Sequence, residues 1–218
     1  ASPVQVVPPI FMLEVLASVT LLRSALRDVD WRWLAWLAAG NALFIPLGVA
    51  TLAWLPEQPL RLLIGVLLLG AALLLRRGVA FGLAPTRGVR IATGAVSGYI
   101  NGLAAIGGIA VAVILSTAQM APATMRATLI LLFLFTDLYA LASAAALDAA
   151  GTSTLGAAGA PLLDARSASH ALWWAPAMLA GIWVGHRGFR RVSPQRFRAI
   201  VLNLLIGIAA LAVARALL

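Results

Sequence analysis

Cysteine and lysine are both absent from these 218 residues, and only two histidines occur, His170 and His186. Without cysteine the chain cannot form a disulfide, use a thiol nucleophile or bind a metal through thiolates. Two histidines do not favour a histidine metal site, so we expect no metal and no cofactor. Charged residues make up only 11% of the chain, against about 25% in soluble domains. The composition therefore excludes an ordinary soluble domain.

Apolar residues account for 62% of the chain, and the mean hydropathy is +1.00. These values predict an all-α, polytopic helical membrane protein whose main partner is the lipid bilayer. The 16 basic residues, all of them arginine, give a net charge of +9. Such a charge would suggest nucleic-acid binding in a soluble protein. Here the arginines fit the rule that cytoplasmic loops of membrane proteins are basic, and no nucleic-acid partner is expected.

Apolar segments alternate with short polar loops along the whole chain. The predicted spans cover residues 6–22, 33–54, 60–75, 124–147, 171–185 and 199–217. Pro8 and Pro9 are expected in the first turn of the first span, where proline is tolerated. Residues 148–169, rich in Gly, Ala and Ser, are expected to form an exposed loop.

Most arginines fall in the loops at 23–32, 76–90 and 187–198. If these loops are cytoplasmic, the last span runs outward and the C-terminus of the chain lies outside.

A glycine-rich stretch stands out between the third and fourth long spans. Gly94, Gly98 and Gly102 recur every four residues, so they share one helix face on which another backbone can approach closely. The pair Gly107-Gly108 then predicts a break in the helix. The pieces on either side, 91–105 and 109–118, are shorter than the about 20 residues that a full span needs. A re-entrant hairpin or a pair of discontinuous helices is therefore expected.

An internal repeat is suggested by an ungapped match of residues 33–75 with residues 170–212. The matched pairs are Trp36 and Trp173, Gly48 and Gly185, Gln58 and Gln195, Arg61 and Arg198, and Gly70 and Gly207. Because the arginines give the two copies opposite orientations, this predicts an inverted-topology repeat within one transmembrane domain, 1–218, as in secondary transporters. The halves would be 1–77 and 90–218. The first half has no counterpart of the glycine stretch, so we expect that the chain is truncated at its N-terminus.

The order and spacing of these features resemble a known family. The pattern Gly94-x3-Gly98-Tyr-x-Asn-Gly102-x4-Gly107-Gly108, with Arg126-Ala-Thr opening a long helix, is similar to the second half of the TauE/SafE sulfite exporter family. The resemblance implies a multi-pass permease of the cell (inner) membrane that exports sulfite or small organosulfonates. The chain departs from the family pattern at Ala105, where glycine is usual, and at Ile109, where proline is frequent.

Five residues of the glycine stretch are the candidate substrate-binding residues: Ser97, Asn101, Gly102, Gly107 and Gly108. A helix that starts after Gly107-Gly108 would present unpaired N–H groups and a positive dipole end, which bind anions. Ser97 and Asn101 lie four residues apart and could donate hydrogen bonds to the same anion. The alternatives are a tight helix crossing for the glycines and an interhelical or backbone hydrogen bond for Ser97 and Asn101.

Two carboxyl groups lie within predicted spans, Asp137 near the middle of its span and Glu14 nearer the end of its own. A central Asp costs about 2.5–3.5 kcal/mol on insertion scales, so such residues usually mark an ion path or form an internal pair. We expect Asp137 and Glu14 to couple transport to a proton or another ion.

Three functions are compatible with such a chain. The first is the export of a small anion by a permease, which could be a homo-oligomer. The second is a membrane scaffold or assembly protein that transports nothing. The third is an intramembrane serine protease, suggested faintly by Val96-Ser97-Gly98; Ala95 stands where such proteases have glycine, and no enzyme is predicted.

Overall fold

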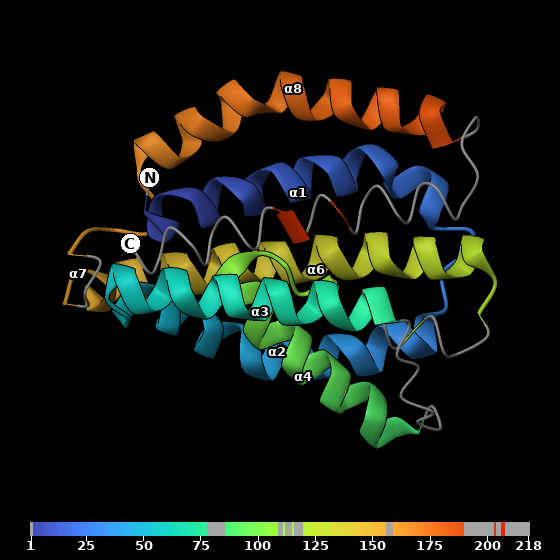
Figure 1. Cartoon of the computed structure of the whole chain (residues 1–218), viewed down its shortest axis with the longest axis horizontal. Coiled ribbons are helices and arrows are strands. Elements are labelled where there is room, and N and C mark those ends of the chain that lie inside the picture. The colour runs from blue at the N-terminus through green and yellow to red at the C-terminus, as the bar shows by residue number, and fades with distance from the viewer. Residues whose placement is uncertain are drawn as a thin grey trace.

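The computed structural model describes residues 2–77, 86–108, 111, 115, 120–155, 159–189, 203 and 206–207, and this part of the chain contains helices and no strand. The helices are α1 (Pro3–Ala25), α2 (Trp31–Trp54), α3 (Glu57–Arg77), α4 (Arg87–Ala104), α6 (Pro122–Ala149), α7 (Thr152–Leu155) and α8 (Ala165–Phe189). The long helices run roughly along one axis of the molecule (Figure 1). The prediction of an all-α polytopic membrane protein is confirmed.

Among the described residues, four helices are long and apolar enough to cross a membrane: α1, α2, α6 and the Glu57–Leu74 part of α3. The helix α8 matches the predicted span 171–185 in position and has sufficient length. It does not reach the hydropathy of the four, because it includes three tryptophans, His170 and Arg187. The predicted span 199–217 lies almost wholly outside the described residues.

The first helix begins earlier than the sequence suggested. Pro3 occupies its first turn, and Ser2 and Gln5 form a capping box with the backbone at the helix start. Pro8 and Pro9 are consequently inside α1, so the prediction that they mark its first turn is wrong. Glu14 in turn lies near the middle of α1 rather than near its end. Pro8 and Pro9 have no backbone N–H, so each removes a hydrogen bond from α1. The apolar packing of α1 against its neighbours offsets this loss.

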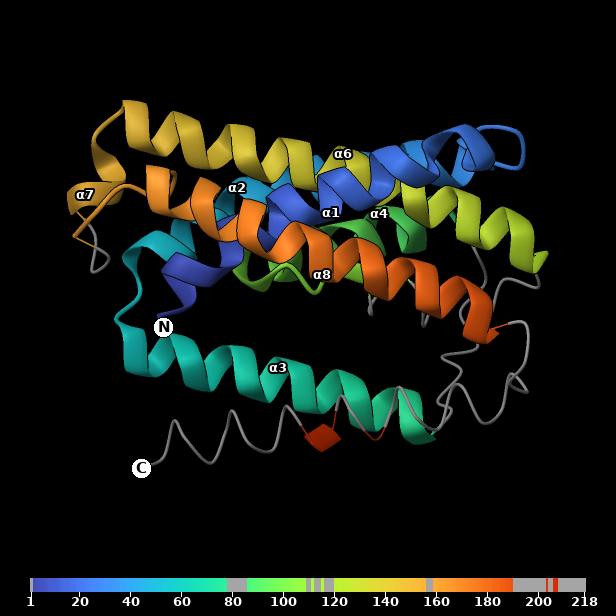
Figure 2. The same ribbon diagram turned by 90° about the horizontal axis from the view of Figure 1, so that it is seen from above.

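The described helices pack as an inner group with two outer helices. Within the inner group, α4 packs along α2, while α6 packs on α1 and α2. The largest apolar cluster joins Phe11 of α1, Ile45 and Leu52 of α2, Leu103 of α4 and Ala140 of α6. The helix α8 contacts α1, and α3 has few contacts with the rest (Figure 2). The tightly packed region is therefore formed by α1, α2, α4 and α6.

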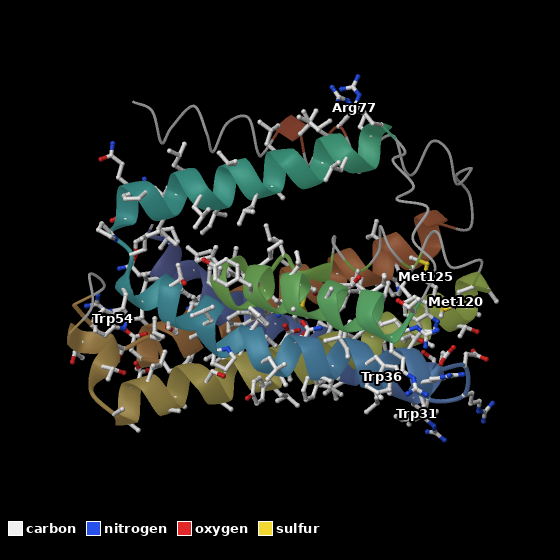
Figure 3. The ribbon with its side chains drawn as sticks, turned by 90° about the horizontal axis from the view of Figure 1, so that it is seen from below. Trp31, Trp36, Trp54, Arg77, Met120 and Met125 are labelled. Carbon is white, nitrogen blue, oxygen red and sulfur yellow. The ribbon has the colours of Figure 1, made fainter. Side chains whose placement is uncertain are left out.

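Basic and aromatic residues gather at one end of the bundle. Trp31, Trp36, Arg77, Met120 and Met125 lie toward this end, and Trp54 lies at the other (Figure 3). Tryptophans at both ends of α2 are typical of the aromatic residues that lie at the two membrane–water interfaces.

The beginnings of α4 and α6 share this arginine-rich end. The Arg90 guanidinium lies 4.3 Å from the centroid of the Trp33 ring, and Trp33 belongs to the same apolar cluster as Leu115 and Leu132, with Met120 packed against it. The chain from α4 to α6 therefore enters and leaves at the same end. This arrangement favours the re-entrant hairpin over two full crossings; the described positions of its second arm, Val111 and Leu115, are helical.

The predicted loop at 148–169 is partly helical. Asp148 ends α6, and its carboxylate accepts hydrogen bonds from the backbone of Leu162 (2.9 Å) and Leu163 (2.8 Å). Asp164 then caps α8 by accepting from the Ser167 backbone N–H (2.7 Å) and hydroxyl (2.8 Å). These side-chain hydrogen bonds satisfy backbone groups that in a flexible loop would bond to water. The prediction that all of residues 148–169 form an exposed loop is therefore wrong.

The inverted repeat stays a prediction. The helix α2 runs away from the arginine-rich end, while α8 runs toward it, as opposite orientations of the two copies require (Figure 1). Residues 190–202, which hold the matches for Gln58 and Arg61, lie outside the described residues.

Candidate functional site

The glycines of α4 form a close contact with α2, which we call the glycine seam: Gly40 and Gly48 of α2 with Gly94, Gly98 and Gly102 of α4. A Cβ added at Gly98 would lie 2.7 Å from Cα of Asn41 and 2.8 Å from its carbonyl oxygen. A Cβ at Gly102 would collide with the carbonyl oxygen of Ile45. The two backbones thus touch directly, which only glycine allows. The expected close approach of another backbone is present.

The α2 side of this seam could have been found in the sequence. Gly40 and Gly48 are eight residues apart, and so are Gly94 and Gly102. In the structure a Cβ on Gly40 would collide with the backbone from Ile91 to Ala95. Equal spacing of small residues on two apolar segments was therefore the signal that predicts which helices meet.

The helix α4 ends at Ala104, in the interior of the bundle. Ala105 adopts a left-handed conformation with φ of 56°, and its N–H still bonds to the carbonyl of Asn101 (2.8 Å). Ala105 is 6% exposed and Leu103 is fully buried. A non-glycine residue in this conformation costs about 1–2 kcal/mol, so the break is imposed by the surrounding contacts and not by a flexible glycine.

Two side chains of α4 hold the residue after the break. The Ser97 hydroxyl donates to the carbonyl of Gly107 (3.0 Å), and Oδ1 of Asn101 accepts from the Gly107 N–H (3.2 Å). Gly107 is required here, because a Cβ would lie 2.6 Å from Cβ of Asn101 and would collide with the Ser97 backbone. Ser97 and Asn101 therefore share the face that their spacing predicted, and both point to the break.

Asn101 also connects the break to α6. Its Nδ2 donates to Oδ1 of Asp137 (3.0 Å), and the Thr136 hydroxyl lies 3.5 Å from the same oxygen. Asp137 is completely buried, and Asn101 is 3% exposed. One amide group thus joins a broken helix to a buried carboxyl on another helix.

A second carboxyl faces the first. Glu14 of α1 is the charged neighbour of Asp137, with the two side chains within hydrogen-bonding reach of each other. Oδ2 of Asp137 is buried and receives no hydrogen bond from any donor in the described part of the chain. Two facing carboxylates would repel each other, whereas one shared proton would remove the repulsion and give Oδ2 a donor.

Most of the predicted site residues are brought together. Ser97, Asn101, Gly107, Asp137 and Glu14 form one connected group, which we call the break cluster. The other two lie beside it. Gly102 belongs to the glycine seam, and Gly108 packs against the Phe133 ring, where a Cβ would lie 2.5 Å from Cε1.

Sequence reasoning missed Thr136 and Phe133, two further α6 residues beside the cluster. Both lie within one turn of Asp137, and this is the signal that could have pointed to them. It also did not pair Glu14 with Asp137, because it placed Glu14 near a helix end.

The break cluster contains no cationic side chain and no cysteine or histidine, and the described residues hold no group of three His, Cys, Asp or Glu that could bind a metal. Its chemistry is limited to hydrogen bonding, to the dipole of a helix start and to proton binding. These are the means by which transporters bind anions and coupling ions at discontinuous helices.

The sequence model described as "Sulfite exporter TauE/SafE" matches residues 1–212 of the chain. The chain belongs to the TauE/SafE sulfite exporter family. Its members are transporters, so the multi-pass membrane protein seen here is a transporter by family. No curated protein and no solved structure matches the chain.

Proposed function

We propose that this TauE/SafE protein is a permease that exports sulfite or a small organosulfonate through the break of α4. The observation that carries the proposal is a helix interrupted inside the bundle at Ala105, with Gly107 held by buried polar side chains. Membrane proteins tolerate such a break only where it is enclosed by protein or lines a cavity. Five glycines and a strained alanine maintain it at a cost that a merely spanning helix would not incur.

The anion would bind at the start of the segment that follows the break. Gly107 and Gly108 can present backbone N–H groups there without a side chain in the way, and Gly108 is helical. A helix start attracts an oxyanion through its N–H groups and its dipole, without a cationic residue. Ser97 and Asn101 would shape this site, and Gly102 would fix it to α2 through the glycine seam.

The carboxyl pair supports coupling to protons. An anion next to two ionised carboxylates would be repelled, and the break cluster offers no cation to offset the repulsion. Protonation of Glu14 and Asp137 removes that obstacle, so the anion and protons would move together. The hydrogen bond from Asn101 to Asp137 and the proximity of Glu14 to Asp137 support this coupling.

Flux into proteoliposomes tests the function. The purified full chain is reconstituted, and uptake of labelled sulfite, methanesulfonate and sulfate is compared with protein-free liposomes. We expect saturable uptake of sulfite or methanesulfonate. A matched pair of variants tests the site: Ser97→Ala removes the hydroxyl that bonds Gly107, whereas Ser24→Ala removes an exposed hydroxyl that bonds its own helix at Leu21. We expect a reduced rate only in the first.

Absence of flux of any small anion would instead favour the scaffold or assembly role. An unchanged rate in Ser97→Ala would move the anion site away from the break.

A further inference from the structure

The break cluster poses a conflict for an anion site. The Gly107 N–H, which should bind the anion, already donates to Oδ1 of Asn101. That oxygen carries a partial negative charge and occupies the position in which an oxyanion would sit. In the conformation seen here Asn101 is therefore a substitute for the anion and not a ligand of it.

We propose that Asn101 is a latch that closes the anion site at Gly107 and is released when the Glu14–Asp137 pair takes up a proton. The proposal rests on the proposed function and deepens it, because it states how proton binding and anion binding are connected. It also assigns Asn101 a role that differs from the direct anion ligand expected from the sequence.

The latch is held at its other end by charge. Nδ2 of Asn101 donates to Oδ1 of Asp137, and a hydrogen bond to a charged acceptor is about tenfold more favourable, as an equilibrium constant, than one to a neutral acceptor. The pair shares one proton at neutral pH and so keeps one negative charge. A second proton neutralises the pair and weakens this bond. The amide of Asn101 is then free to rotate away from Gly107, and the N–H becomes available to the anion.

The carboxyl pair is the ionisable group that faces Asn101 in the described structure. From α1 the facing group is Glu14, and from α6 it is Asp137. The neighbouring stretches of α2 (Trp33–Trp54) and α7 contain no acidic or basic residue, and α4 contributes Arg87 and Arg90 at its far end and Tyr99, which is directed to Thr51 (3.4 Å). A single proton-binding unit therefore controls the latch.

The backbone around Asn101 is fixed, so that only its side chain has to move. Gly98, one turn before, touches Asn41, and Gly102, directly after, touches Ile45 and Val49 of α2. Ser97 holds the Gly107 carbonyl independently of Asn101. The N–H of Gly107 would thus stay in place when Asn101 releases it. The anion site is therefore preformed, and its backbone stays ordered.

Infrared spectroscopy of the full chain in lipid tests the shared proton. We expect the carbonyl band of a protonated carboxyl in the wild type at neutral pH, and its loss in both Glu14→Gln and Asp137→Asn. Asp28→Asn, which changes an exposed carboxyl near the arginine-rich end, should leave the band unchanged. A band that survives both variants, or that the wild type lacks at neutral pH, would overturn the proton-holding pair.

Anion affinity tests the latch. Binding of sulfite and methanesulfonate to the purified chain is measured by calorimetry at about pH 5 and about pH 8. In the wild type we expect binding about tenfold tighter at the lower pH. In Asn101→Ala we expect the tight affinity at both values, because nothing closes Gly107. If Asn101 were instead a direct ligand of the anion, Asn101→Ala would weaken the affinity at both pH values.

Asp137→Asn covers the case in which Asn101→Ala does not fold, since it keeps an acceptor for Nδ2 but cannot carry a charge. The latch predicts tight, pH-independent binding in this variant, and a persistent pH dependence would overturn it. If the wild type binds both anions equally at the two pH values, the latch fails and the proposed function stands. If it binds neither anion, the proposed function fails and the latch with it.

Discussion

The glycine seam and the break cluster lie next to each other on α4 and are built on opposite principles. The seam joins backbone to backbone, and a Cβ at any of its glycines would meet main-chain atoms of the other helix. The break cluster joins side chains and contains two facing carboxyls, one of which has an oxygen, Oδ2 of Asp137, that receives no hydrogen bond from the described residues. The strained Ala105 lies beside it. The first arrangement has one stable geometry, whereas the second has groups whose bonding changes with one proton.

Within the single helix α4, the glycine seam therefore holds the structure in place, and the break cluster carries the proposed function. Successive turns of α4 present glycine to α2 and, on another face, Ser97 and Asn101 to the break. Close packing leaves the seam little freedom to move, so a change at the carboxyls is confined to side chains. The contrast predicts opposite outcomes for substitutions in the two regions.

The largest effect is expected at the seam. Gly40→Val places a branched side chain against the backbone of Ile91 and Ala95. The backbone of α4 cannot give way without a shift of the whole helix. We therefore expect the free energy of unfolding to fall by at least about 3 kcal/mol, the upper part of the range for overpacking. Thermal unfolding of the purified protein in detergent measures the loss. Gly181→Val in α8 is the matched control, because no atom of the described residues lies within 4 Å of its added Cβ. An equal loss of stability in this variant would show that the seam has no special role.

The opposite sign is expected at the carboxyl pair. Glu14→Gln removes one of two facing carboxyls. It also gives Oδ2 of Asp137, which receives no hydrogen bond from the described residues, a permanent N–H donor in place of the shared proton. A hydrogen bond to a charged group contributes about 1.5 kcal/mol or more, so the melting temperature should rise. Transport should fall at the same time. A lower melting temperature would show that the pair stabilises the fold.

A smaller gain is expected where the two regions meet. Ala105→Gly places glycine at a φ of 56°, the residue that the family usually has there. Relief of the left-handed strain should stabilise the protein by about 1 kcal/mol. Ala104→Gly, one residue earlier in regular helix, should instead destabilise it by a similar amount. Equal effects of the two variants in thermal unfolding would contradict a strained break.

The smallest effect is expected far from both regions, at the start of α8. The Ser167 backbone N–H and then its hydroxyl lower the pKa of Asp164. The cap therefore stabilises the protein fully above the unfolded pKa of about 3.9 and is lost as the pH falls through the lower folded value. Asp164→Ala should cost about 0.5–1 kcal/mol at neutral pH. Asp164→Asn keeps the acceptor and should cost less, and its free energy of unfolding should not fall over this acidic range as that of the wild type does. The same pH dependence in the wild type and in Asp164→Asn would exclude the cap.

The apolar spans and the helix break were predictable because both leave local marks in the sequence. Hydrophobic length gave α1, α2, α3 and α6 to within a few residues, and Gly107-Gly108 marked the interruption. The start of α1 was missed because Pro8-Pro9 looked like a helix beginning, whereas tertiary packing carries the helix through them.

The break cluster was predictable only in parts. The spacing of Ser97 and Asn101 placed them on one face, but nothing local to Glu14 pairs it with Asp137, more than 100 residues away. That contact depends on how α1 and α6 cross, which is a property of packing. The partners of the seam were in principle accessible, since Gly40 and Gly48 repeat the spacing of Gly94 and Gly102.

Proton movement driven by a sulfonate gradient tests the central claim most directly. Methanesulfonate stays ionised and carries no proton of its own, so any proton that moves with it is carried by the protein. In proteoliposomes with a pH-sensitive dye inside, an outward gradient of methanesulfonate should drive protons out in the wild type. Asp137→Asn should abolish this proton flux. Methanesulfonate efflux without proton movement in the wild type, or an equal proton flux in Asp137→Asn, would contradict it.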